Sequence, residues 1–310
     1  MTDGYRALSG AAAWLDVSAR GRIVARGRDR ARLLHNLTSN EVKKMRPGDG
    51  CYAFLLNPQG RIQADLGLFC FEDHFLIDTE PELREKVQQH IRRYIIADQV
   101  ELEDVTASTG AVALEGPGAA AVLATLGAPV PVLGYAHMVW ADCTVAAVSL
   151  TGQPGFRLYG PAGQIQEIAC RLSGAGIPAA TPEDARRLRI ENGRPRYGED
   201  IRETSLPQET RQMHAVSFTK GCYLGQEIVE RIRAQGHVNK QLVRVRIAAS
   251  EPPAAGSKLA ANGDEVGEIT SSVYSPEMRT VIALAYVRSN FAEPGTPLDA
   301  GGAAARVSSA

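Results

Sequence analysis

The eight residues from Lys220 to Glu227 bring several reactive side chains together, in the order Lys-Gly-Cys-Tyr-Leu-Gly-Gln-Glu. The thiol of Cys222 can serve as a nucleophile, a redox group or a ligand for a soft metal ion such as iron. The ammonium group of Lys220, two residues earlier, would lower the pKa of that thiol. The alternative is a tight turn in which Cys222 is a small buried side chain.

The residues after this segment predict a short amphipathic helix that begins near Gly225. Apolar Ile228, Val229 and Ile232 are interspersed with charged residues at helical spacing. The reactive segment would then lie where a loop enters a helix. Free backbone N–H groups and the positive end of the helix dipole lower the pKa of a nearby thiol. We therefore predict Cys222 and Lys220 as the reactive pair.

The eight-residue segment resembles the signature of the YgfZ-type folate-binding proteins, which are relatives of the glycine-cleavage T-protein, an aminomethyltransferase. The resemblance implies three domains around a central opening, tetrahydrofolate as the bound ligand, and a role in making or repairing iron–sulfur enzymes. It extends over nearly the whole chain and is weakest in the middle. The other similar segments are residues 33–40, 56–66, 94–106, 189–201 and 283–288.

A reduced folate sets clear demands on its site. Its flat pterin ring has an edge of N–H donors, which a buried carboxylate can pair with, and its tail carries carboxylates that favour arginine or lysine. Glu191 is the first candidate acid, because its segment resembles the T-protein segment whose glutamate holds the pterin. Tyr197, six residues later, is predicted to line the same cleft. The alternatives are a solvated helix acid and a half-buried loop tyrosine.

Asp65 is the second candidate acid. The T-protein has two adjacent aspartates at the matching place, whereas this chain has Ala64 followed by Asp65. Folate binding could survive this change. The altered acid arrangement argues against aminomethyl transfer, because that reaction requires a precisely oriented donor. The alternative for Asp65 is a strand acid that faces solvent.

Four more residues complete the predicted folate site. Three of them belong to the eight-residue signature. The fourth, Arg231, begins a basic run that also contains Lys240 and Arg246. We expect this run to contact the folate tail or an acidic partner. A solvated face is the alternative for the basic run. The four residues are Tyr223, Gln226, Glu227 and Arg231.

The amino-acid composition argues against several classes of function. The chain has 310 residues and a formal net charge of -1, so no overall positive field points to nucleic acid or anionic membranes. The uncharged stretch 119–141 is interrupted by glycines and prolines, which argues against a membrane span. Five scattered cysteines without a Cys-x-x-Cys pair favour reduced thiols in a cytoplasmic protein. The histidines lack metal-ligand spacing, so we predict no metal site.

The hydrophobic patterns predict an α+β fold. The order strand, helix, hairpin, helix, strand occurs twice, which predicts two related antiparallel-sheet and helix domains, residues 1–108 and 109–239. Residues 240–310 are rich in strand patterns and predict a C-terminal β-barrel. The three domains would surround a central cleft.

The function expected from these patterns is a tetrahydrofolate-binding accessory protein for iron–sulfur cluster assembly or repair, rather than an ordinary enzyme. Glu191 and Asp65 would hold the pterin, and Cys222 with Lys220 would be reactive. Its partners would be folate and iron–sulfur client or assembly proteins. The alternatives are a folate-dependent aminomethyltransferase of glycine-cleavage type and a thiol-redox protein.

Overall fold

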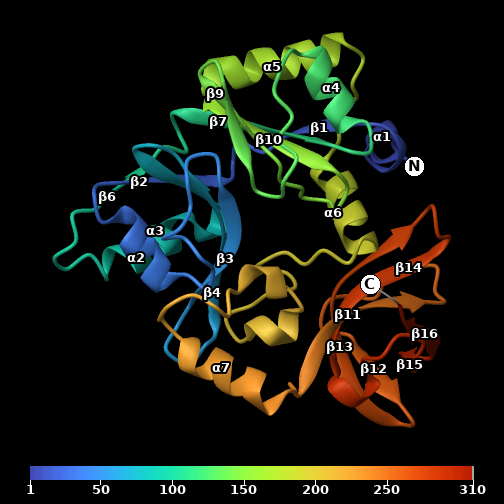
Figure 1. Cartoon of the computed structure of the whole chain (residues 1–310). Helices are drawn as coiled ribbons and strands as arrows, with labels where there is room; N and C mark the ends of the chain where they lie inside the picture. Colours follow the sequence, from blue (N-terminus) through green and yellow to red (C-terminus); the bar gives the residue numbers. More distant parts are fainter. Residues whose placement is uncertain (309–310) are drawn as a thin grey trace.

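Two five-stranded antiparallel sheets and one closed barrel form the framework of the chain (Figure 1). The computed structural model describes residues 1–308. The three bodies are arranged around a central region, which is crossed by the chain that leads from the second sheet to the barrel. The predicted α+β class with a C-terminal barrel is confirmed.

The first sheet has the strand order β3-β4-β5-β2-β6. Along β4, buried side chains alternate with partly exposed ones, as expected for a strand with two different faces. Helices α2 and α3 contribute Leu33, Leu34, Val87 and Ile91 to the apolar core of this sheet. The elements are β2 (Gly21–Arg26), α2 (Arg30–Leu37), β3 (Gly50–Leu56), β4 (Ile62–Cys70), β5 (His74–Thr79), η1 (Pro81–Leu83), α3 (Arg84–Arg92) and β6 (Glu101–Asp104).

The second sheet has the order β1-β7-β10-β9-β8 and packs against α4 and α5. The chain turns at Ala141, whose φ of 50° is incompatible with one continuous strand from 137 to 146. The elements are β1 (Ala13–Asp16), β7 (Thr109–Glu115), α4 (Ala119–Thr125), β8 (His137–Trp140), β9 (Cys143–Ala146), β10 (Gly155–Pro161) and α5 (Ala162–Gly174).

The two sheets repeat one pattern of connections. In each, the strand next to one edge strand leads through a helix to a hairpin, a third strand and a second helix. The edge strand differs, because β6 follows its own helix whereas β1 comes from the N-terminus and pairs with β7. Residues 1–16, which the sequence analysis placed in the first domain, thus pack with the second sheet through β1 and helix α1 (Asp3–Gly10).

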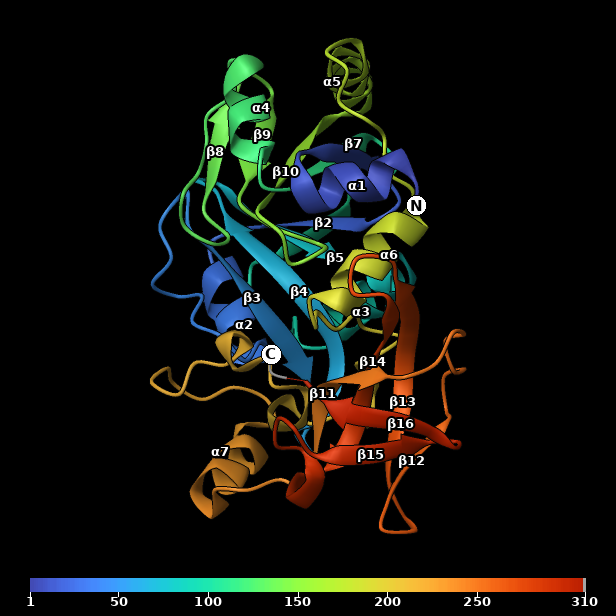
Figure 2. The ribbon, with the colours of Figure 1, turned by 90° about the vertical axis from the view of Figure 1, so that its right-hand side faces the viewer.

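Helix α6 (Pro182–Glu191) has Thr181 as its N-terminal cap. The Thr181 hydroxyl accepts a hydrogen bond from the N–H of Asp184, and the Asp184 carboxylate accepts one from the N–H of Thr181. A long irregular segment follows, with short helical turns η2 (Pro207–Thr210) and η3 (Met213–Ala215), and then α7 (Gln226–Gln235). In Figure 2, α7 and the barrel lie at one end of the molecule, and α4 and α5 at the other.

The barrel closes in the order β11-β14-β13-β12-β15-β16 around a small apolar core. Its elements are β11 (Lys240–Ile247), β12 (Lys258–Ala261), β13 (Asp264–Ser275), β14 (Thr280–Arg288), η4 (Ser289–Phe291), β15 (Pro297–Ala300) and β16 (Ala303–Val307). Within residues 1–308, no helix combines the length and the apolar character needed to cross a bilayer.

Candidate ligand-binding site

A cavity of about 460 Å³ lies between the two sheets and is closed on a third side by α6. Its walls also include the loop between β1 and β2 and, from the segment after α6, residues 194–196 and Glu199. The barrel contributes no lining residue. The volume is within the range typical of small-molecule sites.

Asp65, one of the predicted site residues, lines this cavity from β4. The Tyr52 hydroxyl donates a hydrogen bond of 2.8 Å to Asp65 Oδ2. The other oxygen, Oδ1, is buried and has no hydrogen-bond partner among residues 1–308. Burial and the nearby charge of Glu80 raise the pKa of Asp65 to about 6, against the hydrogen bond from Tyr52. A buried acceptor left unpaired is costly, and Asp65 lines the cavity, so a ligand group in the cavity is the candidate partner for this oxygen.

The side chain of Ala64, next to Asp65 in the sequence, points into the apolar core instead of the cavity. Successive side chains of a strand alternate between faces, and Ala64 is only 1% exposed as a member of the apolar core. An acid at position 64 would therefore enter apolar surroundings, not the cavity. Asp65 is the member of this pair that lines the cavity. The argument against aminomethyl transfer from Ala64 consequently loses its force.

Three aromatic rings, Tyr52, Tyr135 and Phe69, form one wall of the cavity. The rings of Tyr52 and Tyr135 stack at 6.1 Å, and those of Phe69 and Tyr135 at 6.3 Å. Tyr135 has a φ of 63°, which is rare for a bulky residue and is a form of strain that clusters at functional sites. A Cβ at Gly50 would lie 2.3 Å from the Tyr135 carbonyl, so glycine permits this close approach.

Buried ion pairs fix the floor of the cavity across the two sheets. Asp78 of β5 lies 2.5 Å from Arg20 and 2.8 Å from Arg157 of β10, and the Tyr159 hydroxyl donates to it at 3.0 Å. Burial opposes ionisation of Asp78, but the two guanidinium groups outweigh it and lower the pKa. These charges pair with one another, and Arg157 connects the second sheet to Asp78 of the first.

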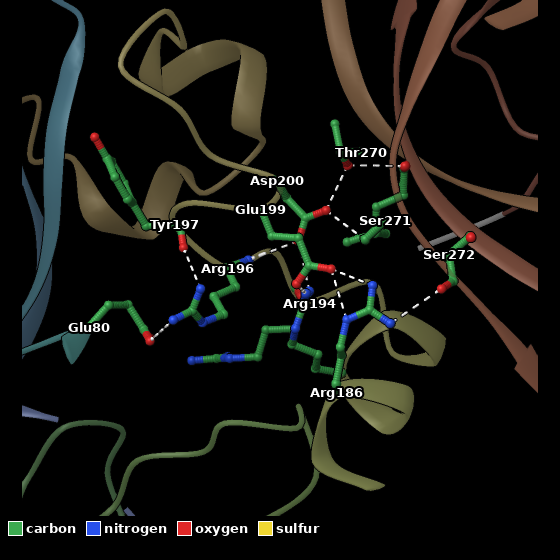
Figure 3. A network of polar contacts seen from close by, with 12 residues as sticks. Glu80, Arg186, Arg194, Arg196, Tyr197, Glu199, Asp200, Thr270, Ser271 and Ser272 are labelled. Atoms are coloured by element: carbon green, nitrogen blue, oxygen red, sulfur yellow. Dashed lines mark hydrogen bonds and ion pairs between the residues drawn. The ribbon is translucent and has the colours of Figure 1, made fainter. Parts of the chain in front are cut away.

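A second polar network orders the segment after α6 (Figure 3). Glu199 accepts from both Arg186 and Arg189, and Asp200 lies 2.7 Å from Arg189. Arg196 pairs with Glu80 at 2.9 Å and thereby ties the segment to the first sheet. The network holds residues 194–199 against the cavity.

Arg194 differs from the other cavity arginines. Its guanidinium group hydrogen-bonds to Tyr135, and no carboxylate pairs with it within the described part of the chain. The cavity lining contains six arginines and five acids, and hence an excess of one positive charge when all are ionised. When Asp65 is protonated, the lining has an excess of two positive charges. The cavity therefore favours a ligand that carries negative charge as well as donors.

Glu191, the other predicted acid, does not line the cavity. Residues Pro182, Ala185, Arg186 and Arg189 form the cavity face of α6. Glu191 is two residues beyond Arg189, about 200° further around the helix. Its carboxylate accepts the Tyr5 hydroxyl at 2.9 Å, and burial raises its pKa against hydrogen bonds from Ser275 and Tyr5. In this position, Glu191 joins α6 to α1 and the barrel.

Lys220 is buried and is directed toward the end of α2. Its ammonium donates to the backbone carbonyls of His35, Thr38 and Asn40 at 2.5, 2.6 and 2.8 Å. Burial lowers the pKa of Lys220 to about 8, against the charge of Glu41. A cation at this place supplies donors for carbonyls that a helix end leaves without partners. The geometry thus gives Lys220 a structural role.

We expect Lys220→Met to lower the free energy of unfolding by on the order of 3 kcal/mol, because three carbonyls lose their donor and buried acceptors without partners are costly. Chemical denaturation measures this change. Lys43→Met, which removes an exposed ammonium from the loop after α2, serves as the control. Equal stability of the two variants would contradict the structural role.

The signature segment rests on two other segments that resemble the same family. Leu224 N–H donates to the Asn36 carbonyl at 3.0 Å. Gly225 has a φ of 83°, and a Cβ there would lie 2.5 Å from the Asn57 carbonyl, so only glycine fits. Between these anchors Cys222 is exposed to solvent. It does not line the cavity that contains Asp65.

The remaining predicted residues also lie outside the cavity lining. Tyr197 and Tyr223 are buried in the core of the first sheet. Gln226 begins α7 and is partly buried, whereas Glu227 and Arg231 are exposed on that helix. The predicted meeting of Asp65, Glu191 and Cys222 in one cavity is therefore not found. Their roles in binding stay predictions.

Sequence patterns missed much of this site. Arg20, Asp78 and Arg157 come from three distant strands or loops, and nothing local marks them as partners. Tyr52 falls in a predicted strand, where alternation indicates a face but not a contact with Asp65. Among residues 1–308, no group of three or more histidine, cysteine, aspartate or glutamate side chains is placed to hold a metal ion.

Comparison with known proteins is consistent with this architecture. The family described as "GCVT N-terminal domain" matches residues 1–220, and "Glycine cleavage T-protein C-terminal barrel domain" matches residues 240–309. An aminomethyltransferase of Thermoanaerobacter sp. (strain X514) is 25% identical over 307 residues, covering 95% of this chain and 83% of the relative. One from Rubrobacter xylanophilus is 29% identical over 290 residues, covering 91% and 78%.

The fold is also similar to a solved structure, the glycine cleavage system aminomethyltransferase T from Bartonella henselae. The TM-score is 0.90 at 24% identity, and the similarity covers 99% of this chain and 87% of that one. This similarity establishes the three-body architecture.

Proposed function

The chain belongs to the glycine cleavage T-protein family, and we propose on this basis that its cavity binds a reduced folate for folate-dependent aminomethyl transfer. The ligand would be tetrahydrofolate or a derivative. The relatives above are named aminomethyltransferases, which favours this function over the accessory role expected from the signature segment.

One observation carries the proposal. Asp65 lines a 460 Å³ cavity with an aromatic wall, and one of its carboxylate oxygens is buried without a partner among residues 1–308. A pterin edge supplies the N–H donors that such an oxygen needs, and the pterin ring matches a flat aromatic surface. Arg194, which has no paired carboxylate in the described residues, suits an acidic tail. The residues present therefore fit the ligand.

A bound reduced folate would supply the nitrogen atoms that accept the one-carbon unit. Asp65 would bind and orient the ligand through Oδ1, and Tyr52 would hold that carboxyl in position through Oδ2. With a pKa of about 6, Asp65 can hold or release a proton near neutral pH. The rings of Tyr135 and Phe69 would exclude water from the reacting face.

Calorimetric titration with tetrahydrofolate tests binding, and formation of methylenetetrahydrofolate from an aminomethyl-loaded lipoyl protein tests transfer. We expect saturable binding with one site per chain and measurable product. Absence of binding at millimolar ligand would contradict the folate proposal. Binding without product would reject the transfer reaction alone.

Folate affinity should depend on pH. Below pH 6 the carboxyl of Asp65 takes up a proton and can no longer accept at both oxygens, so affinity should fall, approaching tenfold for each pH unit. Titrations between pH 5 and 8 measure this. Asp65→Asn should show weak binding with this dependence removed. An unchanged profile in Asp65→Asn would assign the dependence to another group.

The accessory role in iron–sulfur cluster assembly or repair is the second candidate. Exposure of Cys222 on a loop anchored by Lys220 and Leu224 favours it, because a fixed and accessible thiol can contact a client protein. The thiol-redox function would use the same group. The cytoplasmic location stays a prediction from the cysteine pattern.

A cell-based comparison separates this candidate from the first. In cells that lack the chain and are complemented with variants, Cys222→Ser should leave iron–sulfur enzyme activity near the level without the chain. Cys170→Ser, which removes another exposed thiol on α5, should restore activity as the wild type does. Equal rescue by both variants would reject a role for Cys222 in this process.

A further inference from the structure

A second cavity, of about 380 Å³, lies between the barrel and residues 202–205 of the segment after α6. Its barrel walls come from β11, β14 and the strands β12 and β13. It shares no lining residue with the cavity that contains Asp65. Nothing in the proposed folate chemistry uses it.

Positively charged side chains outnumber negatively charged ones in the lining of this cavity. Four cations and two acids face it. Lys258 forms ion pairs with both acids, at 2.9 Å from Glu265 and 3.2 Å from Glu268. Arg202 lies 3.5 Å from Glu268. Lys240 and Arg288 remain without a carboxylate partner in the part of the chain that the structure describes. The net excess is two positive charges.

The two unpaired cations lie directly opposite each other on neighbouring strands. Lys240 of β11 is paired in register with Arg288 of β14. Side chains at such positions start about 5 Å apart, and like charges there are destabilising unless something neutralises them. The Lys240 ammonium lies 4.8 Å from the ring centroid of Tyr286, whose hydroxyl is held by Ser205 at 3.0 Å. The lysine is thus positioned over a fixed, buried surface.

We propose that this second cavity binds an oxyanion, a carboxylate or a phosphate, between Lys240 and Arg288. The guanidinium fork of Arg288 can donate two parallel hydrogen bonds to one anionic group, and Lys240 adds a point charge. An anion placed there removes the repulsion between the two strands. The site goes beyond the proposed folate function and stands on its own residues.

Two sources can supply this group. One is a free small oxyanion, and the other is the chain of γ-linked glutamates that extends the tail of many folates. The second source rests on the proposed function. It is sterically reasonable because Glu199 lines the first cavity and Arg202 the second, and three residues span at most about 11 Å.

Calorimetry at low ionic strength with inorganic phosphate and with γ-glutamylglutamate tests the site. We expect the double variant Lys240→Gln/Arg288→Gln to bind whichever probe the wild type binds at least about tenfold more weakly. Arg279→Gln removes an exposed charge from the turn between β13 and β14, outside the cavity, and should bind like the wild type. Melting temperatures verify that each variant is folded.

Comparison of tetrahydrofolate mono- and triglutamate distinguishes the sources. Tighter binding of the triglutamate by the wild type, lost in the double variant, would assign the site to the folate tail. Equal binding of both folates together with phosphate binding would assign it to a free oxyanion. If neither probe binds the wild type at 10 mM, or if the double variant binds as well, the oxyanion site is wrong. Monoglutamate binding tests the Asp65 cavity separately.

Discussion

Asp65→Ala should weaken tetrahydrofolate binding by roughly 100-fold, because the ligand would lose its hydrogen bond to the charged Oδ1, and hydrogen bonds to charged groups contribute more than neutral ones. Aminomethyl transfer should fall by at least the same factor. The substitution leaves Tyr52 without its acceptor, but Ala64 and the core beneath the strand are untouched. Calorimetry and product formation measure the two effects.

The matched control is Asp73→Asn, which neutralises an exposed acid in the turn between β4 and β5 of the same sheet. It should bind folate as the wild type does. Wild-type affinity in Asp65→Ala would remove Asp65 from the site. The cavity would then need another acid, and the unpaired Oδ1 atom would need another explanation.

Asp200→Ala should be the most destabilising single substitution that we propose. Asp200 is fully buried and accepts from the hydroxyls of Thr270 and Ser271 at 2.6 Å each, and from Arg189 at 2.7 Å (Figure 3). Its loss leaves the guanidinium of Arg189 with one acidic partner fewer and the buried Ser271 hydroxyl without its acceptor. The Thr270 hydroxyl keeps only the Leu284 carbonyl, at 3.1 Å. The expected loss in free energy of unfolding is about 3–5 kcal/mol.

The effect should reach the cavity, because Asp200 connects the barrel to α6 and fixes residues 194–199. Denaturant unfolding measures stability, and folate titration measures the cavity. Asp264→Ala, at an exposed position on β13, should change stability by less than about 0.5 kcal/mol. A loss below 1 kcal/mol in Asp200→Ala would contradict a central role for this network.

The framework of the fold could be predicted because its signals are local. The strand patterns after residue 240, for example, depend on the alternation of neighbouring residues. The N-terminal strand was missed, because β1 is short and its partner β7 lies nearly a hundred residues away. Pairing between distant segments leaves no periodic signal.

The site was predicted less well than the fold, for a similar reason. Asp65 could be found because a resemblance marked it. The cavity also depends on how two sheets pack, and the contacts among Arg20, Asp78 and Arg157 exist only after that packing. Glu191 and Lys220 show the converse: motif residues can be buried and satisfied away from the ligand cavity.

A crystal structure of the chain with tetrahydrofolate tests the central claim most directly. The account predicts the pterin in the cavity between the sheets, with its donor edge within hydrogen-bond distance of Asp65 Oδ1 and its ring beside Tyr52 and Tyr135. Folate bound elsewhere, with Asp65 facing only water, would contradict it.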